Sequence, residues 1–347
     1  MQKINMDDIK TTKEKKKIYY GVDFFKLVCA LLIVLMHSDC HDLTYHGYRP
    51  FIATWLIYWL PNLSVPFFFI ASGFFFTKGL QRNADDQWHY LRRYLMRIFK
   101  MYVFWTIVTL PIAWKCIEAG HPDYSIPLRL VYIVRMFLFS GSLGIYWFIL
   151  SLMYVAAMIY FTERKHCDWL FYTMAIGMWI VGHIYGLYYT KHAPTTRDFL
   201  YPIYFFFGST RNFLNAGMIF MGIGHFFAKH KINISMPWLL IALLASLVLL
   251  RYQWEWFHIA ISYPFAAGLL FLVASRLQMK WLAKYSLHVR KLSTAIYLGQ
   301  FPFLLVFDFY LRKGTLLDFS LAVLFCVVLY ILVIKFLPKK WSDIIYG

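Results

Sequence analysis

Long apolar stretches recur along the whole chain, separated by short polar segments. A stretch of roughly 17–25 apolar residues is long enough to cross a lipid bilayer as a helix. By this criterion the sequence predicts about ten membrane-spanning helices, some of them interrupted by proline or glycine, which membrane helices tolerate. Their approximate ranges are 19–38, 52–76, 98–118, 145–161, 169–189, 212–228, 236–250, 256–274, 293–310 and 317–337. A further apolar stretch, 131–140, is expected to be an interfacial or re-entrant segment.

The composition agrees with a chain that lies mostly in lipid. Of its 347 residues 61% are hydrophobic and 21% aromatic, and only 15% are charged, against about 25% charged residues in soluble domains. A water-soluble protein of this length has too small a core to bury so much apolar surface. We therefore expect an all-α, polytopic integral membrane protein, with one membrane domain over 19–338 between short tails at 1–18 and 339–347.

The net charge of +18 raises the question of a nucleic-acid partner, and the positions of the charges answer it. In the ten-helix arrangement, 24 of the 35 Lys and Arg residues fall in segments on the same side as the N-terminus, and ten fall on the other side. By the positive-inside rule both tails are cytoplasmic (N-in, C-in). The charge is then a signal for topology and for anionic lipid, and no nucleic-acid partner is predicted.

The N-terminus has some features of a secretory signal, because the basic run KEKKK (13–17) precedes an apolar stretch. No A-x-A-like cleavage site follows it, so the first helix is expected to be retained. The five cysteines show no CxxC spacing and indicate no zinc site. A disulfide between Cys40 and Cys116 is an open possibility, because both residues fall on the outer side in the predicted topology.

The first predicted helix carries three ionisable residues among apolar ones: Asp23, Lys26 and His37. Lys26 and His37 are eleven positions apart, which places them on one face of a helix at a separation of about 16 Å. Asp23 lies one turn before Lys26, close enough to pair with it. One interpretation is structural: Lys26 extends to the inner surface, Asp23 caps the helix and His37 lies at the interface. The alternative is functional, because ionisable residues inside a membrane usually mark a pathway or a site, and histidine suits proton transfer near neutral pH.

Other clusters of polar residues point less clearly to a site. His37, His41 and His46 with Asp39 and Asp42 include an i, i+4 histidine pair with metal-ligand spacing, but such clusters are frequent in loops and no metal site is predicted. His225 and His258 are expected to be packed or interfacial.

Several motifs in order resemble the membrane acyltransferase 3 family. The pattern G-x-D-F-F-K-(x10)-H around Lys26 and His37 is similar to that family's first helix, with lysine where arginine is commoner. "VPFFFIASGFFF" (65–76), "YLRRYLMRIFKMYVFW" (90–105) and "YWFILSLMY" (146–154) resemble its next helices. "STRNFLNAGMIFMGIGHFFA" (209–228) and "LSTAIYLGQFP" (292–302) resemble the variant that forms the membrane half of vancomycin-resistance serine racemases. No racemase half is present in this sequence.

The resemblance implies an enzyme that takes an acyl group, usually acetyl from cytoplasmic acetyl-CoA, and transfers it to a hydroxyl of a cell-envelope glycan or lipid-linked sugar. The expected location is the bacterial plasma membrane. His37 is the expected general base, and Lys26, paired with Asp23, is expected either to bind the donor or to stabilise the oxyanion. Whether a covalent acyl-enzyme forms stays open. The residues expected at the donor phosphates are Arg92, Arg93, Arg97 and Lys100; which pair replaces the family's R-x-x-R is open, and a topology role is the alternative for each.

The expected acceptor pocket rests on the same resemblance. Ser72 provides either a hydroxyl or, as we favour, close helix packing. Tyr146 and Trp147 either line a sugar platform or belong to an interfacial aromatic belt, which is the commoner role. Arg211 and Asn212 either hold an anionic group or contribute to topology. Gln300 stands where the family often has histidine, so no second histidine role is carried over.

A transporter or flippase without acyl-transfer chemistry is the rival interpretation, because the similar membrane half of the racemases has been regarded as a serine importer. Such a protein should have polar groups on broken helices at the midplane and inverted repeats. Neither feature is clear in this sequence.

Overall fold

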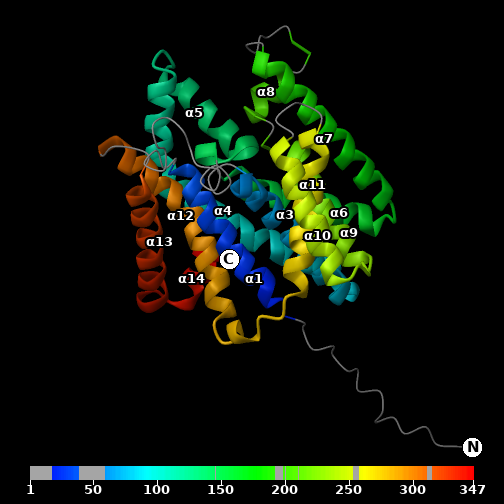
Figure 1. Ribbon diagram of the computed structural model, residues 1–347. Helices are drawn as coiled ribbons and strands as arrows, with labels where there is room; N and C mark the ends of the chain where they lie inside the picture. The colour runs from blue at the N-terminus through cyan, green and yellow to red at the C-terminus, as the bar shows by residue number, and fades with distance from the viewer. Residues whose placement is uncertain are drawn as a thin grey trace, which may run out of the picture.

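The computed structural model describes residues 18–38, 59–144, 146–191, 198–199, 201–209, 211–252, 258–310 and 315–347, and these residues form helices and no strand (Figure 1). The long helices are α1 (Tyr20–His37), α3 (Leu60–Arg82), α4 (Gln87–Gly120), α6 (Trp147–Arg164), α7 (Asp168–Lys191), α9 (Met218–Lys229), α10 (Met236–Tyr252), α11 (His258–Arg276), α12 (Ser286–Tyr310) and α13 (Leu316–Phe336). Shorter α-helices are α5 (Ile126–Arg135), α8 (Tyr201–Phe207) and α14 (Lys339–Tyr346). The π-helices η5 (Met136–Ser140) and η7 (Phe213–Gly217) and the 3-10 helices η4 (Ala84–Asp86), η6 (Ser142–Gly144) and η8 (Lys280–Leu282) complete the set.

Each of the ten apolar segments predicted from the sequence overlaps a long helix, but several boundaries differ, among them the start of α12 at Ser286 rather than 293 and the start of α9 at Met218 rather than 212. Helix α3 continues past Phe76 to Arg82, because Thr77 and Leu80 are buried even though Lys78 interrupts the apolar run. Helix α4 begins three turns earlier than predicted, at Gln87, where the Asp86 side chain accepts a hydrogen bond from the backbone N–H of His89 at 3.1 Å. Such a cap satisfies one of the free N–H groups at a helix start.

Five helical segments in the described part of the chain are long and apolar enough to cross a membrane. They are Tyr20–His37, Leu60–Arg82, Ala84–Gly120, Ile126–Gly144 and Leu316–Phe336. The fourth contains the stretch 131–140, expected above to be interfacial or re-entrant. Ten spans and an N-in, C-in topology stay predictions.

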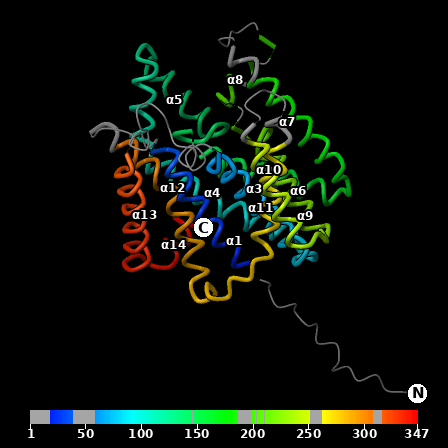
Figure 2. The backbone as a smooth tube through the Cα atoms, viewed as in Figure 1, coloured from blue at the N-terminus to red at the C-terminus, as the bar shows by residue number. Residues whose placement is uncertain are grey.

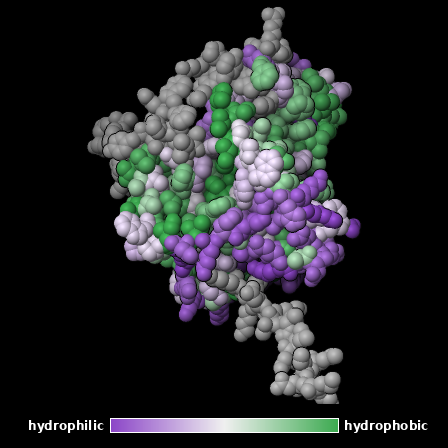
Figure 3. Space-filling model, turned by 90° about the vertical axis from the view of Figure 1, so that its right-hand side faces the viewer, coloured by the Kyte–Doolittle hydropathy of each residue, from purple (hydrophilic) through white to green (hydrophobic). Residues whose placement is uncertain are grey.

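The surface has the pattern of a protein that faces lipid. Large apolar side chains on several helices are exposed, among them Ile107, Leu244, Phe265 and Leu324. Figure 3 shows one face of the molecule on which hydrophilic side chains gather toward the lower end and hydrophobic ones cover much of the rest. An exterior that is apolar over long helices favours a membrane environment.

Helix α1 lies between α12 and α3 (Figure 2) and packs closely against both. Helix α3 in turn packs along α9. Glycines allow these two backbones to approach: a Cβ on Gly73 would collide with the carbonyl oxygen of Met221, and a Cβ on Gly224 with that of Ile70. Small residues at helix–helix contacts are typical of membrane proteins.

Residues 339–346, expected as part of a short tail, form α14, which packs against α4, α12 and α13. Ile345 and Tyr346 are buried, and the Ile345 carbonyl accepts a hydrogen bond from Trp105 Nε1 at 2.9 Å. This helix therefore forms part of the interior at the end of the bundle where α1 begins (Figure 1).

Candidate functional site

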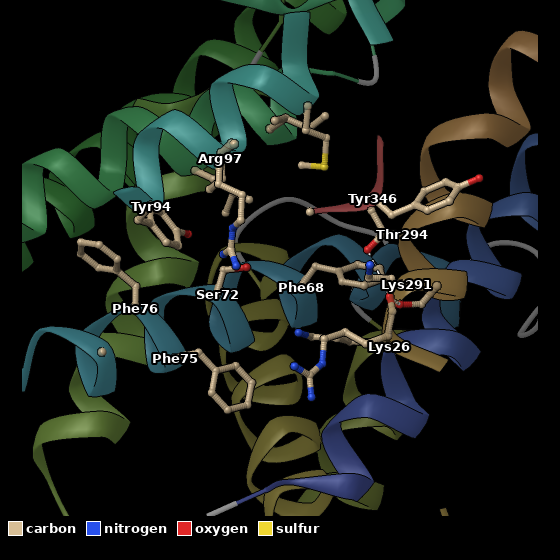
Figure 4. Close-up of a pocket in the computed structure, with 18 of the residues that line it drawn as sticks. Lys26, Phe68, Ser72, Phe75, Phe76, Tyr94, Arg97, Lys291, Thr294 and Tyr346 are labelled. Carbon is tan, nitrogen blue, oxygen red and sulfur yellow. Dashed lines mark hydrogen bonds between the residues drawn. The ribbon is translucent and has the colours of Figure 1, made fainter. Parts of the chain in front are cut away.

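A cavity of about 790 Å³ lies between the helices at the end of the bundle where α1 begins. Its walls come from α1, α3, α4, α6, α12 and α14. Figure 4 shows Arg97 reaching from α4 toward Ser72 of α3, with Lys26, Lys291 and Thr294 across the cavity. Aromatic side chains, including Phe75, make up much of the remaining wall.

The cavity is strongly cationic. The two acidic side chains in its lining, Asp23 and Asp343, are each bound to a base: Asp23 to Arg290, and Asp343 to Lys291 with Oδ1 at 2.6 Å from Nζ. Four further cations line the cavity, and none has a carboxylate within 4.0 Å in the described part of the chain: Lys26, Arg82, Arg93 and Arg97. A cavity with this lining attracts an anion.

Asp23 pairs with a different residue from the one expected. Arg290 Nε donates to Asp23 Oδ1 at 3.1 Å, and Arg290 Nη2 donates to Oδ2 at 3.0 Å. Ser286 Oγ also donates to Oδ2, at 2.7 Å. The expectation of an Asp23–Lys26 pair is therefore wrong, because the carboxylate faces α12 rather than the next turn of its own helix.

Lys26 instead extends into the cavity. Its Nζ lies 5.2 Å from the centroid of the Phe75 ring, a distance at which a cation is attracted to the ring face. The residue is half-buried, and the described residues offer it no ion pair or side-chain hydrogen bond. The ammonium group is thus available to a ligand.

The basic start of α4 divides into two sets. Arg93 and Arg97 are four residues apart, share one face of the helix and line the cavity. The guanidinium of Arg97 lies 5.7 Å from the centroid of the Tyr94 ring. All four side chains are exposed, but Arg92 and Lys100 do not line this cavity. The spacing that brings bases together here is R-x3-R.

His37 lies outside the cavity, at the far end of α1. Its Nδ1 is 3.3 Å from Gln300 Oε1, and its ring packs edge-on against Phe301, with centroids 5.2 Å apart. An amide oxygen only accepts, so Nδ1 carries the proton and Nε2 keeps its lone pair. Gln300 lies one turn beyond Tyr297 on α12, and Tyr297 lines the cavity. Helix α12 therefore connects the cavity to the histidine.

Of the remaining predicted pocket residues, only Ser72 lines the cavity. Tyr146 is fully buried and donates to the Leu298 carbonyl at 3.2 Å, while Trp147 is buried against Phe69, with ring centroids 5.5 Å apart. Both rings belong to the packed core.

Arg211 and Asn212 lie apart from the cavity. Arg211 is exposed. Asn212 is buried and caps η7, accepting from the Asn215 N–H at 2.9 Å and donating to the Ser209 carbonyl at 3.0 Å. This geometry gives Asn212 a structural role at the start of the helix.

Three residues that line the cavity were not predicted from the sequence: Arg290, Lys291 and Tyr297. The contact between Gln300 and His37 was not predicted either. Arg290 and Lys291 were counted as loop charges because the apolar stretch begins just after them. A signal was present, since positions 290, 294 and 297 recur at helical spacing and place one cation and two polar residues on one face.

The other histidines and the cysteines considered from the sequence do not line the cavity where they are described. His225 is buried, with Nδ1 2.8 Å from Thr77 Oγ1, so it is packed within the core. Cys116 has a free thiol, and Cys40 lies outside the described residues. Apart from His37, the residues of the His/Asp cluster lie outside the described residues, and so does the side chain of His258.

Two curated proteins have sequences similar to this chain. An amino-acid racemase of Enterococcus faecalis is 24% identical over 212 residues, which cover 60% of this chain and 28% of that protein. Another amino-acid racemase of the same organism is 21% identical over 129 residues, 37% of this chain and 17% of that protein. The alignments thus span less than a third of either racemase. No solved structure matches the chain.

The family comparison covers far more of the molecule. The model described as "Acyltransferase domain", that of the acyltransferase 3 family, matches residues 19–335. This range begins beside α1 and ends within the last turn of α13, so it includes every helix that lines the cavity except α14. The expected relationship is confirmed: the chain belongs to the acyltransferase 3 family.

Proposed function

We propose that this protein is a membrane acyltransferase that moves an acyl group, acetyl in the simplest case, from cytoplasmic acyl-CoA to a hydroxyl of a cell-envelope glycan or lipid-linked sugar. The observation that carries the proposal is the cationic cavity at one end of α1, with His37 at the other end of the same helix. Family membership supports acyl transfer in general. The proposed location is the bacterial plasma membrane, with the cavity facing the cytoplasm.

The lining of the cavity suits the donor. Coenzyme A carries phosphate groups, which guanidinium groups bind through paired hydrogen bonds. Arg93, Arg97 and Lys26 have no carboxylate partner among the described residues and would bind these phosphates without first breaking an ion pair. In the proposed arrangement Lys26 binds the donor, because it projects into the cavity with the two arginines.

The two ends of α1 would act on different parts of the donor. Lys26 and His37 are eleven residues apart, a rise of about 16 Å along a helix. The extended pantetheine arm of coenzyme A is long enough to span that separation. Phosphates bound near Lys26 would therefore leave the thioester close to His37.

His37 would act as the general base. Its Nδ1–H is directed to Gln300, so Nε2 is the atom that accepts the proton of the attacking hydroxyl. The hydroxyl oxygen forms the new ester bond as the thioester C–S bond breaks, and the thiolate takes up the proton. Acetylation of a glycan hydroxyl by this route consumes only the donor and the acceptor.

Radiolabelled acetyl-CoA, supplied to inverted membrane vesicles that contain the full chain, tests the proposal. Label should enter the glycan fraction with the wild-type protein and fall to background with His37→Ala, while the variant accumulates in the membrane normally. Persistent incorporation with His37→Ala would remove His37 as the base. The similarity to racemases supports a second candidate function, that of a transporter. Serine uptake by these vesicles without acetyl incorporation would favour it.

A further inference from the structure

Gln300 connects α12 to His37 through only one half of its side-chain amide. Its Oε1 accepts from His37 Nδ1, whereas its Nε2 has no hydrogen-bond partner among the described residues. The residue is 0% exposed, so bulk water does not satisfy this nitrogen. Buried amides are nearly always hydrogen-bonded, and an exception needs a specific explanation. A donor that gains its partner only when a substrate is present is such an explanation.

The position of the amide suits a substrate group beside His37. Tyr297 and Leu298 are the last residues of α12 that line the cavity, and Gln300 follows within one turn. The amide therefore contacts the imidazole and lies within one helical turn of residues that line the cavity. Because Oε1 and Nε2 are bonded to the same carbon, an atom that accepts from Nε2 lies close to the His37 ring.

The proposed reaction needs a hydrogen-bond donor near His37 that none of the residues assigned so far supplies. Attack on a thioester places negative charge on the carbonyl oxygen, and enzymes stabilise that charge with hydrogen-bond donors fixed in advance. Lys26 is about 16 Å from His37 along α1 and lies in the cavity with the donor-binding bases. It is poorly placed to serve both the phosphates and the reacting carbonyl.

We propose that Gln300 is a catalytic residue: its Nε2–H groups bind the carbonyl oxygen of the acyl thioester, and its Oε1 holds His37 with Nε2 free to accept a proton. This assignment rests on the proposed acyl-transfer function. It gives each end of one amide a separate task. The hydrogen bond from His37 polarises the amide and makes its N–H groups better donors.

The step balances without a further reactant. His37 Nε2 removes the proton of the acceptor hydroxyl, and the hydroxyl oxygen bonds to the thioester carbonyl carbon. The electron pair displaced from the C=O bond rests on the oxygen that Gln300 binds. As the carbonyl reforms, the C–S bond breaks, and the departing thiolate takes the proton from His37.

Two substitutions of Gln300 remove the amide donor, and one of them keeps an acceptor for His37. Gln300→Met keeps the approximate size and removes both the donor and the acceptor. Gln300→Glu keeps an acceptor for His37 Nδ1 but replaces the donor. Ser246→Ala is the matched control, because Ser246 is also buried and hydrogen-bonded, to the Leu243 carbonyl on α10, away from the cavity.

The assay is the initial rate of radiolabelled acetyl transfer in membrane vesicles at varied acetyl-CoA, divided by the number of sites that bind radiolabelled coenzyme A. Both Gln300 variants should lose about 100-fold or more in kcat, as expected for one oxyanion donor, with KM for acetyl-CoA within about threefold of wild type. Ser246→Ala should stay within about twofold in both constants. The division by binding sites removes losses that come from misfolded protein.

Each other outcome overturns the assignment. If Gln300→Glu or Gln300→Met keeps more than a tenth of the wild-type kcat, the donor is not needed. A raised KM with unchanged kcat would place Gln300 in donor binding. His37→Ala, measured in the same assay, separates a failure of the Gln300 assignment from a failure of the proposed function. If His37→Ala is inactive and the Gln300 variants are active, only the role of Gln300 is refuted. A wild-type protein that transfers no acetyl refutes the proposed function as well.

Discussion

Arg290 of α12 holds Asp23 of α1 through two hydrogen bonds, Nε to Oδ1 at 3.1 Å and Nη2 to Oδ2 at 3.0 Å. The Asp23 side chain is only 3% exposed, whereas that of Arg290 is 45% exposed. The pair joins the first helix to α12 at the wall of the cationic cavity. It also occupies the one carboxylate on α1 that could have neutralised Lys26.

The two partners of this ion pair should differ in their effect on stability. Arg290→Met leaves a buried carboxylate with Ser286 as its remaining partner and should cost about 2–3 kcal/mol, below the usual range for a fully buried pair because Arg290 is partly exposed. Asp23→Asn keeps a hydrogen-bonding side chain and should cost about 1 kcal/mol. Unfolding in detergent measures both. The double variant should be less destabilised than the sum of the two, and simple additivity would mean that the pair contributes nothing.

The helices themselves could largely be predicted from the sequence, because a membrane chain must satisfy its backbone hydrogen bonds within each segment. The apolar runs located α1 and α13 to within about one residue. They misplaced the end of α3 and the starts of α4 and α12, where the helix continues through charged residues. The packing of α14 was not predictable from the sequence, since a segment with as many polar residues as 339–346 reads as a tail until it meets a partner.

The close approach of α3 and α9 gives a second stability prediction. Gly73→Ala places a methyl group against the Met221 carbonyl oxygen, so the helices must separate, at a cost of about 1–3 kcal/mol. Gly177→Ala on α7 meets nothing within 4 Å and should be neutral or stabilising by up to about 1 kcal/mol. Thermal unfolding of both variants in the same detergent makes the comparison. Equal melting temperatures for the two would show that the glycine contact is not tight.

The candidate site was only partly predictable, and the residues show why. Helical spacing placed Lys26 and His37 on one face of the first helix, a property of that helix alone. Which of the four bases near α4 face inward depends on the rotation of that helix against its neighbours, which local spacing does not specify. The Asp23–Arg290 pair joins positions 267 residues apart, and no local pattern indicates such a contact. The same holds for Gln300 and His37.

Because only two of the four α4 bases line the cavity, donor binding can be separated from topology. Arg93→Glu with Arg97→Glu should raise KM for acetyl-CoA at least tenfold, since two phosphate-binding groups are lost and repulsion is added. Arg92→Glu with Lys100→Glu makes the same change of charge at two bases of α4 that do not line the cavity, and it should change KM less than about twofold. The measurement is the vesicle acetyl-transfer assay at varied acetyl-CoA. Equal effects of the two pairs would reduce all four residues to topology or lipid-headgroup signals.

Lys26 offers the last test, because it is the cation of α1 that lines the cavity. If its task is to bind a phosphate of the donor, Lys26→Arg should keep at least about a third of the wild-type kcat/KM, since both side chains supply a positive donor. Lys26→Met removes the charge but keeps the length and the packing against Phe75, and it should lower kcat/KM more than tenfold, mainly through KM. Coenzyme A binding to detergent-solubilised protein gives an independent readout and should weaken by a similar factor. A loss confined to kcat, with coenzyme A binding unchanged in Lys26→Met, would instead assign Lys26 to the reacting carbonyl and contradict the division of tasks between Lys26 and Gln300.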